Sequence, residues 1–202
     1  MDEITAISAL ILGIALLLCV ISAALAHQHH LLRGVQYLIF SSYVFVNLYE
    51  TLLFRMVTPD AQYELGFLWS YREALGVHIG SGNEVRILIT DSGLLKEIIL
   101  NILLYIPLGY LVPVTWPKLA EKATSKSRST LFRWITNMPW KIVLIGLLCS
   151  TVTEITQLVF HLGLFEFDDI LNNTIGCAIG MMIYWFFMKN RMRRRKPHSP
   201  CA

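Results

Sequence analysis

Long apolar runs constrain the fold of this chain more than any other feature. Runs of about twenty residues, long enough to cross a hydrocarbon core of about 30 Å, occupy residues 4–26, 35–57, 94–113, 142–160 and 169–188. The chain is 55% hydrophobic and 15% charged, which is too apolar for an ordinary soluble domain. A large soluble helical core would show polar faces at helical period. We therefore predict an all-α, polytopic membrane helix bundle with about five transmembrane helices, in one domain over residues 1–202.

The first run shares one feature with a cleaved signal peptide. Ala24-Leu25-Ala26 has the small-x-small pattern of a cleavage site. The flank before the run is acidic, with Asp2 and Glu3, and the run is too long for the apolar part of a typical signal peptide. We expect a helix that is retained in the mature protein.

The distribution of basic residues predicts the orientation of the five spans. All 17 Lys and Arg residues except Arg55, Arg72, Arg86 and Lys96 fall on the side that holds the C-terminus. The positive-inside rule then places the N-terminus outside and the C-terminus, with its basic tail at residues 189–202, in the cytoplasm. We expect a multi-pass protein of the plasma membrane. The outer loop at residues 58–93 is predicted to form an interfacial helix or a re-entrant segment around residues 67–75, followed by a flexible turn.

Carboxylates and amides from several spans are predicted to meet at one depth near the outer side. Polar groups inside a membrane are costly and mark functional sites. The residues concerned are Glu97 and Asn101 on the third span, Glu154 and Gln157 on the fourth, and Asp168, Asp169 and Asn173 on the fifth. Each span presents its polar residues on one helical face, three or four positions apart. We predict that they form a polar pocket, open to the outside, that binds a cation or the polar groups of a ligand.

Small residues predict how the helices pack beside that pocket. Gly176 and Gly180 form a small-xxx-small face on the fifth span, on the same side as its polar residues, and such a face lets another helix approach closely. The third span contains Pro107 and Gly109, and a proline inside a membrane helix predicts a kink.

Three readings of the polar residues stay open at this point. Asp168 or Asp169 can cap the N-terminus of its own helix. Glu154 can be a neutral carboxyl that only holds helices together, or it can act with Asp169 as a general acid and base. The chain carries no motif of a known hydrolase, nucleotide-binding or metal site. Its four cysteines have no metal-ligand spacing, and no nucleic-acid partner is expected beside a membrane span. No cofactor or oligomeric state is indicated.

Three stretches, taken together, resemble the VanZ-like family of bacterial membrane proteins. They are NILLYIPLGYLVP at residues 101–113, TEITQL at residues 153–158 and LFEFDDILNNTIGCAIG at residues 164–180. The family pattern has an Asn before an apolar-Pro-x-Gly turn, then Glu-x-x-Gln, then an acidic patch that leads into Asp-x-x-x-Asn-x-x-Gly. Relatives often carry an arginine just before the acidic patch, where this chain has His161-Leu162-Gly163. Arg72, in the outer loop, is a candidate to replace it.

The resemblance implies a role in the cell envelope. The family's namesake is associated with low-level resistance to the glycopeptide teicoplanin in Gram-positive bacteria. Our hypothesis is that the outer pocket binds a lipid-linked cell-envelope precursor or the glycopeptide antibiotic itself. A membrane-embedded hydrolase or transferase and a structural partner protein are the alternatives.

Overall fold

The computed structural model describes residues 17, 21, 31–53, 55, 57–79, 85–89, 91–120 and 140–194. The first predicted span, apart from residues 17 and 21, lies outside the described residues. So do most of the basic loop that precedes the fourth predicted span and the last eight residues of the basic tail.

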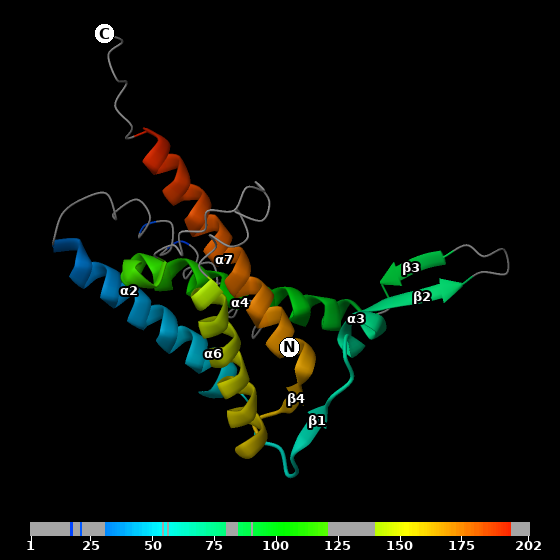
Figure 1. Cartoon of the computed structure of the whole chain (residues 1–202). Helices are drawn as coiled ribbons and strands as arrows, with labels where there is room; N and C mark the ends of the chain where they lie inside the picture. The colour runs from blue at the N-terminus through cyan, green and yellow to red at the C-terminus, as the bar shows by residue number, and fades with distance from the viewer. Residues whose placement is uncertain are drawn as a thin grey trace, which may run out of the picture.

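Helices make up most of the described chain (Figure 1). The α-helices are α2 (Leu31–Leu48), α3 (Trp69–Ala74), α4 (Ser92–Thr115), α6 (Trp140–Val159) and α7 (Phe167–Arg194). A π-helix, η1 (Tyr49–Leu53), continues α2, and a 3-10 helix, η2 (Pro117–Ala120), follows α4. Four short strands complete the fold: β1 (Gln62–Glu64), β2 (Leu75–Ile79), β3 (Val85–Ile89) and β4 (Leu164–Glu166).

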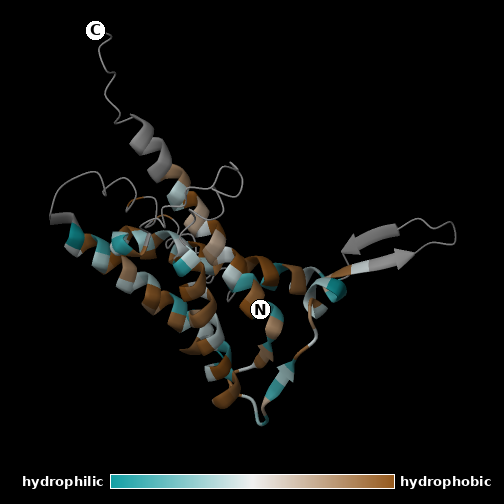
Figure 2. Cartoon of the chain, viewed as in Figure 1, coloured by the Kyte–Doolittle hydropathy of each residue, from teal (hydrophilic) through white to brown (hydrophobic). Residues whose placement is uncertain are grey.

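Three of the described helices are long and apolar enough to cross a membrane. They are Ser92–Thr115, Trp140–Val159 and Phe167–Phe187, and hydrophobic residues dominate long stretches of them (Figure 2). Their ends agree within two residues with the third, fourth and fifth predicted spans. Helix α2 with η1 spans residues 31–53, which includes residues 35–53 of the second predicted span, and is not among the three. The total of five spans and the orientation of the termini stay predictions.

Contacts between the helices fix their relative directions. Ile102 and Ile106 of α4 face Gly176 and Gly180 of α7 in the same order, so these two helices run parallel. Ser150 of α6 accepts a hydrogen bond from Asn173 of α7, and the carbonyl of Ile142 accepts one from Cys177. The later residue of α6 thus meets the earlier residue of α7, so the two helices run antiparallel. This alternation is the one expected of three consecutive membrane crossings. It also gathers the N-terminal ends of α4 and α7 and the C-terminal end of α6 at one end of the bundle.

Glycines allow α4 and α7 to touch along their backbones. A methyl group at Gly176 would collide with the carbonyl of Ile102, and one at Gly180 with that of Ile106. On α4, a methyl group at Gly109 would collide with the carbonyl of Cys177. We call this contact, made by Gly109, Gly176 and Gly180, the glycine crossing. It brings the polar residues at the start of α7 next to those of α4.

The prolines of α4 lie inside a helix that continues past them. Pro107 and Pro113 are both buried, and α4 extends unbroken to Thr115. Pro107 has no N–H, which leaves the carbonyl four residues earlier without its usual helical donor. The Tyr43 hydroxyl of α2 donates to the next carbonyl, that of Leu104, at 2.9 Å. A neighbouring helix thus supplies a donor where the helix ladder is weakened.

The strands are the part of the fold that the all-α prediction did not include. Helix α3 confirms the predicted helix in the outer loop. The prediction of a flexible turn after this helix is wrong for residues 75–79 and 85–89, because they form strands β2 and β3. These strands pair antiparallel, with Leu75 opposite Ile89 and Ile79 opposite Val85. In Figure 1 this hairpin projects away from the helices. Strands β1 and β4 pair parallel and tie the loop after η1 to the loop before α7.

Candidate functional site

Polar side chains gather where α4 and α7 begin and α6 ends. We call this region the polar end. It contains the seven residues predicted from the sequence, Glu97, Asn101, Glu154, Gln157, Asp168, Asp169 and Asn173, together with Arg55, Ser70, Tyr71, Glu166 and Asn172. Asp168, Asn172, Gln157, Glu154 and Asn173 are at most 3% exposed. So many buried polar groups need partners within the protein or from a ligand.

Asp168 holds the start of α3 in place. One of its carboxylate oxygens accepts a hydrogen bond from the backbone N–H of Leu68 at 2.7 Å. The other accepts from the backbone N–H of Ser70 at 3.0 Å and from its hydroxyl at 2.7 Å. The side chain of Leu68, at the N-cap of α3, makes no capping bond itself. Capping of its own helix was one reading left open for Asp168 or Asp169; the structure shows that Asp168 instead caps α3.

Asp169 joins α7 to α4. Its Oδ1 accepts a hydrogen bond from Nδ2 of Asn101 at 2.6 Å. The charges of Glu97, Glu154 and Glu166 also act on this region, since each lies within electrostatic reach of the Asp169 carboxylate. The adjacent residues Asp168 and Asp169 therefore have different surroundings. Backbone N–H groups hold the Asp168 carboxylate, whereas the Asp169 carboxylate lies among acidic groups.

Glu154 is buried in the middle of that acidic group. Its side chain is 2% exposed, and its Oε2 accepts from the backbone N–H of Glu166 at 3.2 Å. Glu166 ends β4, where it stands opposite Glu64 of β1. The pairing of β1 with β4 thus fixes Glu166, whose backbone N–H holds the Glu154 carboxyl. The sequence of α6 alone does not reveal this contact.

Arg55 supplies the positive charge of the polar end. Its guanidinium acts on the carboxylates of Glu154, Glu166 and Asp169. Its side chain lies against Gly163, which adopts φ +128°, a conformation that side chains rarely adopt. Hydrogen bonds from the backbone N–H and hydroxyl of Thr58 to the carbonyl of His161 hold the two loops together. An arginine distant in sequence therefore lies beside the stretch where relatives often carry one.

Arg72 does not take this position. It lies on the exposed side of α3, because the buried face of that short helix is made by Ser70 and Ala74. The suggestion that Arg72 replaces the missing arginine is wrong, and Arg55 is the guanidinium near the carboxylates.

Burial changes the protonation of groups at the rim of the polar end. It raises the pKa of Glu166 to about 8, with the negative charges of Asp169 and Glu97 adding to the rise and Arg55 opposing it. Burial also raises the pKa of the Tyr71 hydroxyl, with Asp168 and Asp169 adding to the effect. This hydroxyl donates a hydrogen bond to Oδ1 of Asn172. Glu166 therefore changes charge near neutral pH, as groups in functional sites often do.

Within the part of the chain that the structure describes, several buried amide atoms at the polar end lack a hydrogen-bond partner. Gln157 donates from Nε2 to the carbonyl of Thr51 at 2.8 Å, while its Oε1 has no partner. Asn173 donates to the hydroxyl of Ser150 at 2.9 Å, while its Oδ1 has none, and Nδ2 of Asn172 is also unpaired. Unpaired buried polar atoms are rare in native proteins and point to a missing water or ligand. Among the described residues, no group of three His, Cys, Asp or Glu residues is arranged to hold a metal ion.

Comparison with known proteins identifies the family. The family model described as VanZ/LLP1 matches residues 9–188, which is most of the chain. The chain belongs to the VanZ/LLP1 family. Within it, the chain is 26% identical over 106 residues to Protein VanZ of Enterococcus faecium, covering 52% of this chain and 55% of that protein. The match thus spans only about half of that VanZ protein's length. No solved structure matches the chain.

Three parts of the site in this VanZ/LLP1 protein were not found from the sequence. Arg55 reaches the carboxylates through a loop contact that no local pattern announces. Glu166 was not among the residues predicted for the pocket, although only Phe167 separates it from the acidic pair. Ser70 and Tyr71 come from the outer-loop helix, whose aromatic residues suggested only a position at the membrane surface.

Proposed function

We propose that the polar end binds the polar head of a lipid-linked envelope component or of a lipoglycopeptide, and that this binding lowers susceptibility to teicoplanin. Membership of the VanZ/LLP1 family and similarity to Protein VanZ support the resistance role at the level of the family. The topology predicted from the basic residues turns the polar end outward. Wall precursors and glycopeptides meet the membrane on that side.

The buried carboxylates carry the proposal. Glu154 and Asp169 lie inside a region that packing alone does not require to be charged, because the glycine crossing already holds α4 against α7. Keeping ionisable groups at membrane depth is costly, so a function that uses them is the simplest reason for their presence. The unpaired atoms of Gln157, Asn172 and Asn173 offer both donors and acceptors to a ligand.

The charge balance indicates the kind of head group that fits. Three carboxyl groups, those of Glu154, Glu166 and Asp169, lie within reach of a single guanidinium, that of Arg55, and Glu97 adds its negative charge to Glu166 and Asp169. Acceptors therefore exceed donors, and a head that carries amino groups or several hydroxyls complements this end.

A second candidate function is catalysis on a lipid-linked substrate. The observation that favours it is the mutual electrostatic influence of Glu154 and Asp169, one deeply buried and the other hydrogen-bonded to Asn101. Two carboxyl groups in different environments can divide the roles of general acid and general base. Incubation of purified protein with candidate lipids separates this from binding, because only catalysis yields a new product.

Teicoplanin susceptibility in a sensitive Gram-positive host tests the proposal. The host expresses wild type, Glu154→Gln, Asp169→Asn or Glu73→Gln, and immunoblots of membranes verify equal protein levels. Glu73 is an exposed carboxylate on α3 and serves as the matched control. We expect protection by wild type and Glu73→Gln, and loss of most protection with the other two. Equal protection by all four proteins would contradict a role for the polar end.

A further inference from the structure

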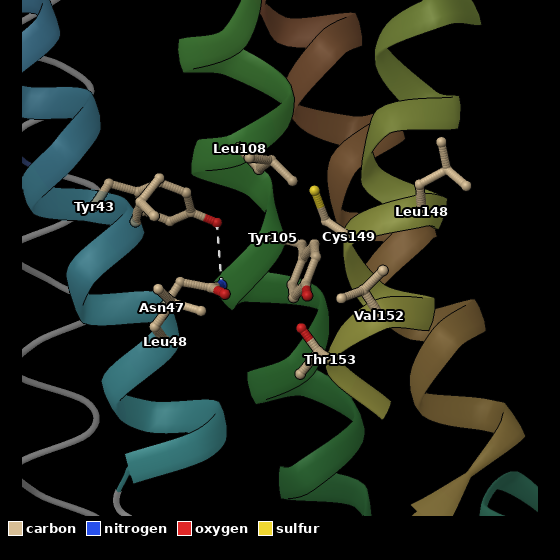
Figure 3. A pocket seen from close by; sticks show the side chains of 10 residues that line it. Tyr43, Asn47, Leu48, Tyr105, Leu108, Leu148, Cys149, Val152 and Thr153 are labelled. Carbon is tan, nitrogen blue, oxygen red and sulfur yellow. Dashed lines mark hydrogen bonds between the residues drawn. The ribbon is translucent and has the colours of Figure 1, made fainter. Parts of the chain in front are cut away.

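The exposed side of α6 is an apolar stripe that leads to the polar end. Leu148 and Val152 (Figure 3), followed by Ile155 and Val159, are all exposed. These residues lie three or four positions apart, on one side of a helix that is long enough to cross a membrane. A stripe of this kind on a spanning helix faces hydrocarbon, and it continues to Val159, the last residue of α6.

The loop between η1 and α3 lies where this stripe ends. The backbone N–H of Thr58 donates to the carbonyl of His161, two residues after the end of α6, at 2.7 Å. At the other end of the loop, Phe67 packs against Phe167, the first residue of α7, with ring centroids 6.1 Å apart. The loop is therefore held at the level where the α6 span ends and the α7 span begins.

Strand β1 divides the side chains of this loop between two faces. Paired residues of neighbouring strands share a face, and consecutive residues alternate between faces. Glu64 therefore shares a face with Glu166, a member of the polar end. Tyr63 shares the other face with Phe165. The small sheet thus has one face with carboxyl groups and one face with aromatic side chains.

Hydrogen bonds fix the backbone on both sides of Phe67. The Glu64 carboxylate accepts from the backbone N–H of Gly66 at 2.8 Å. The Asp168 carboxylate accepts from the backbone N–H of Leu68 at 2.7 Å. A loop held in this way keeps its apolar side chains exposed, although contact with water costs free energy that an apolar environment recovers.

Three apolar side chains of the loop, which we call the loop face, are strongly exposed. Tyr63, Leu65 and Phe67 are 66%, 64% and 64% exposed. Together they offer roughly 400 Å², since a large aromatic side chain covers roughly 150–250 Å². This is about half of the roughly 800 Å² that each partner contributes to a stable protein interface. The loop face is therefore small for a protein partner, and it lies beside the ends of two membrane spans.

We propose that the loop face lies in the membrane, in the leaflet on the side of the polar end, where it contacts the ester layer and upper acyl chains of phospholipids. Tyr63 suits this level, because its ring is apolar and its hydroxyl reaches the polar head groups. The carboxyl-bearing face of the sheet then turns away from lipid, toward the polar end. This proposal does not rest on teicoplanin resistance or on ligand binding at the polar end.

Photo-crosslinking of the full chain tests this placement. The photoreactive amino acid p-benzoylphenylalanine replaces Tyr63, Leu65 or Gln62, one at a time, in vesicles of phosphatidylethanolamine and phosphatidylglycerol. Gln62 is the matched control, because it is exposed and lies on the opposite face of β1 from Tyr63. Peptide mass spectrometry measures adducts of lipid mass. We expect roughly tenfold more lipid adduct at positions 63 and 65 than at position 62, the preference that burial of one large apolar side chain provides.

Two probe positions keep the test decisive if one variant fails to fold. Both Tyr63 and Leu65 are exposed, so their replacement disturbs no packed core, and comparison of Tm with wild type verifies this. Equal lipid labelling at positions 62, 63 and 65 would overturn the proposal. So would the absence of lipid adducts at positions 63 and 65, which would place the loop face in water. Adducts to a protein segment at both positions would also overturn it, since they would show that protein covers the loop face.

Discussion

The glycine crossing and the polar end join the same two helices by opposite means. At the crossing, Gly109, Gly176 and Gly180 remove side chains so that the backbones of α4 and α7 touch. At the polar end, about two turns away along α7, Asn101 and Asp169 span the same pair of helices with a hydrogen bond between charged and polar groups. Close packing of the two backbones makes the contact at the glycine crossing. The contact at the polar end brings carboxylates to membrane depth.

This difference separates what the two regions are for. Close packing of small residues is an efficient way to associate helices in lipid, where the hydrophobic effect gives no drive. A buried carboxylate adds a desolvation cost that packing does not have. Changes at the crossing should therefore appear as loss of folded protein. Changes among the carboxylates should leave the fold largely intact and alter binding, with Asp168 as the exception because it caps α3.

The largest effect is expected at the glycine crossing. Gly176→Leu drives a side chain into the carbonyl of Ile102, and overpacking against backbone has no cheap relief. We expect almost no monodisperse protein by size-exclusion chromatography in detergent. Gly34→Leu is the matched control, because nothing lies within 4 Å of the position where its side chain would begin. Normal yield of Gly176→Leu would show that the helices do not pack as described.

Asp168 should give the next largest effect. Asp168→Ala removes three hydrogen bonds and leaves the backbone N–H groups of Leu68 and Ser70 without their acceptor. We expect a loss of roughly 2–4 kcal/mol in stability, with faster hydrogen exchange in α3. Asp169→Ala removes one bond and should cost less. A larger effect for Asp169 than for Asp168 would reverse the roles assigned to the two carboxylates.

Glu166 should give the smallest effect, visible as a pH dependence. Burial raises its pKa from the ordinary 4.5 to about 8, so the folded protein favours the protonated form. Its contribution to stability is therefore complete below about pH 4.5 and is lost as the pH rises through about 8. We expect the Tm of the purified protein to fall between these values and Glu166→Gln to flatten that part of the profile.

Glu73→Gln is the control for this titration, since Glu73 is exposed on α3. It should reproduce the wild-type profile. A wild-type Tm that rises over the same pH range would show that Glu166 is not buried among like charges.

The sequence was sufficient for features that depend on local pattern. Apolar runs located the ends of α4 and α6, and those of the apolar part of α7, Phe167–Phe187, within two residues. The spacing of Gly176 and Gly180 pointed to a packing face on α7. Helical period also placed Asn101, Glu154 and Asp169 near one level. These features follow from the length of a span and from 3.6 residues per turn.

Contacts between loops could not be predicted from the sequence, with one exception. Nothing near Arg55 announces that it will lie against Gly163, and the pairing of β1 with β4 joins two short segments about a hundred residues apart. The hairpin is the exception, because Val77-His78-Ile79 and Val85-Arg86-Ile87 alternate around Gly-Ser-Gly-Asn, a pattern typical of paired strands.

Direct binding is the measurement closest to the central claim. Purified full-length protein in nanodiscs is titrated with teicoplanin, comparing wild type, Glu154→Gln and Glu73→Gln, after their Tm values have been matched. We predict saturable binding by wild type and Glu73→Gln, and affinity lower by about tenfold or more in Glu154→Gln, since a hydrogen bond to the Glu154 carboxyl is lost. Equal affinity in all three proteins would contradict binding at the polar end.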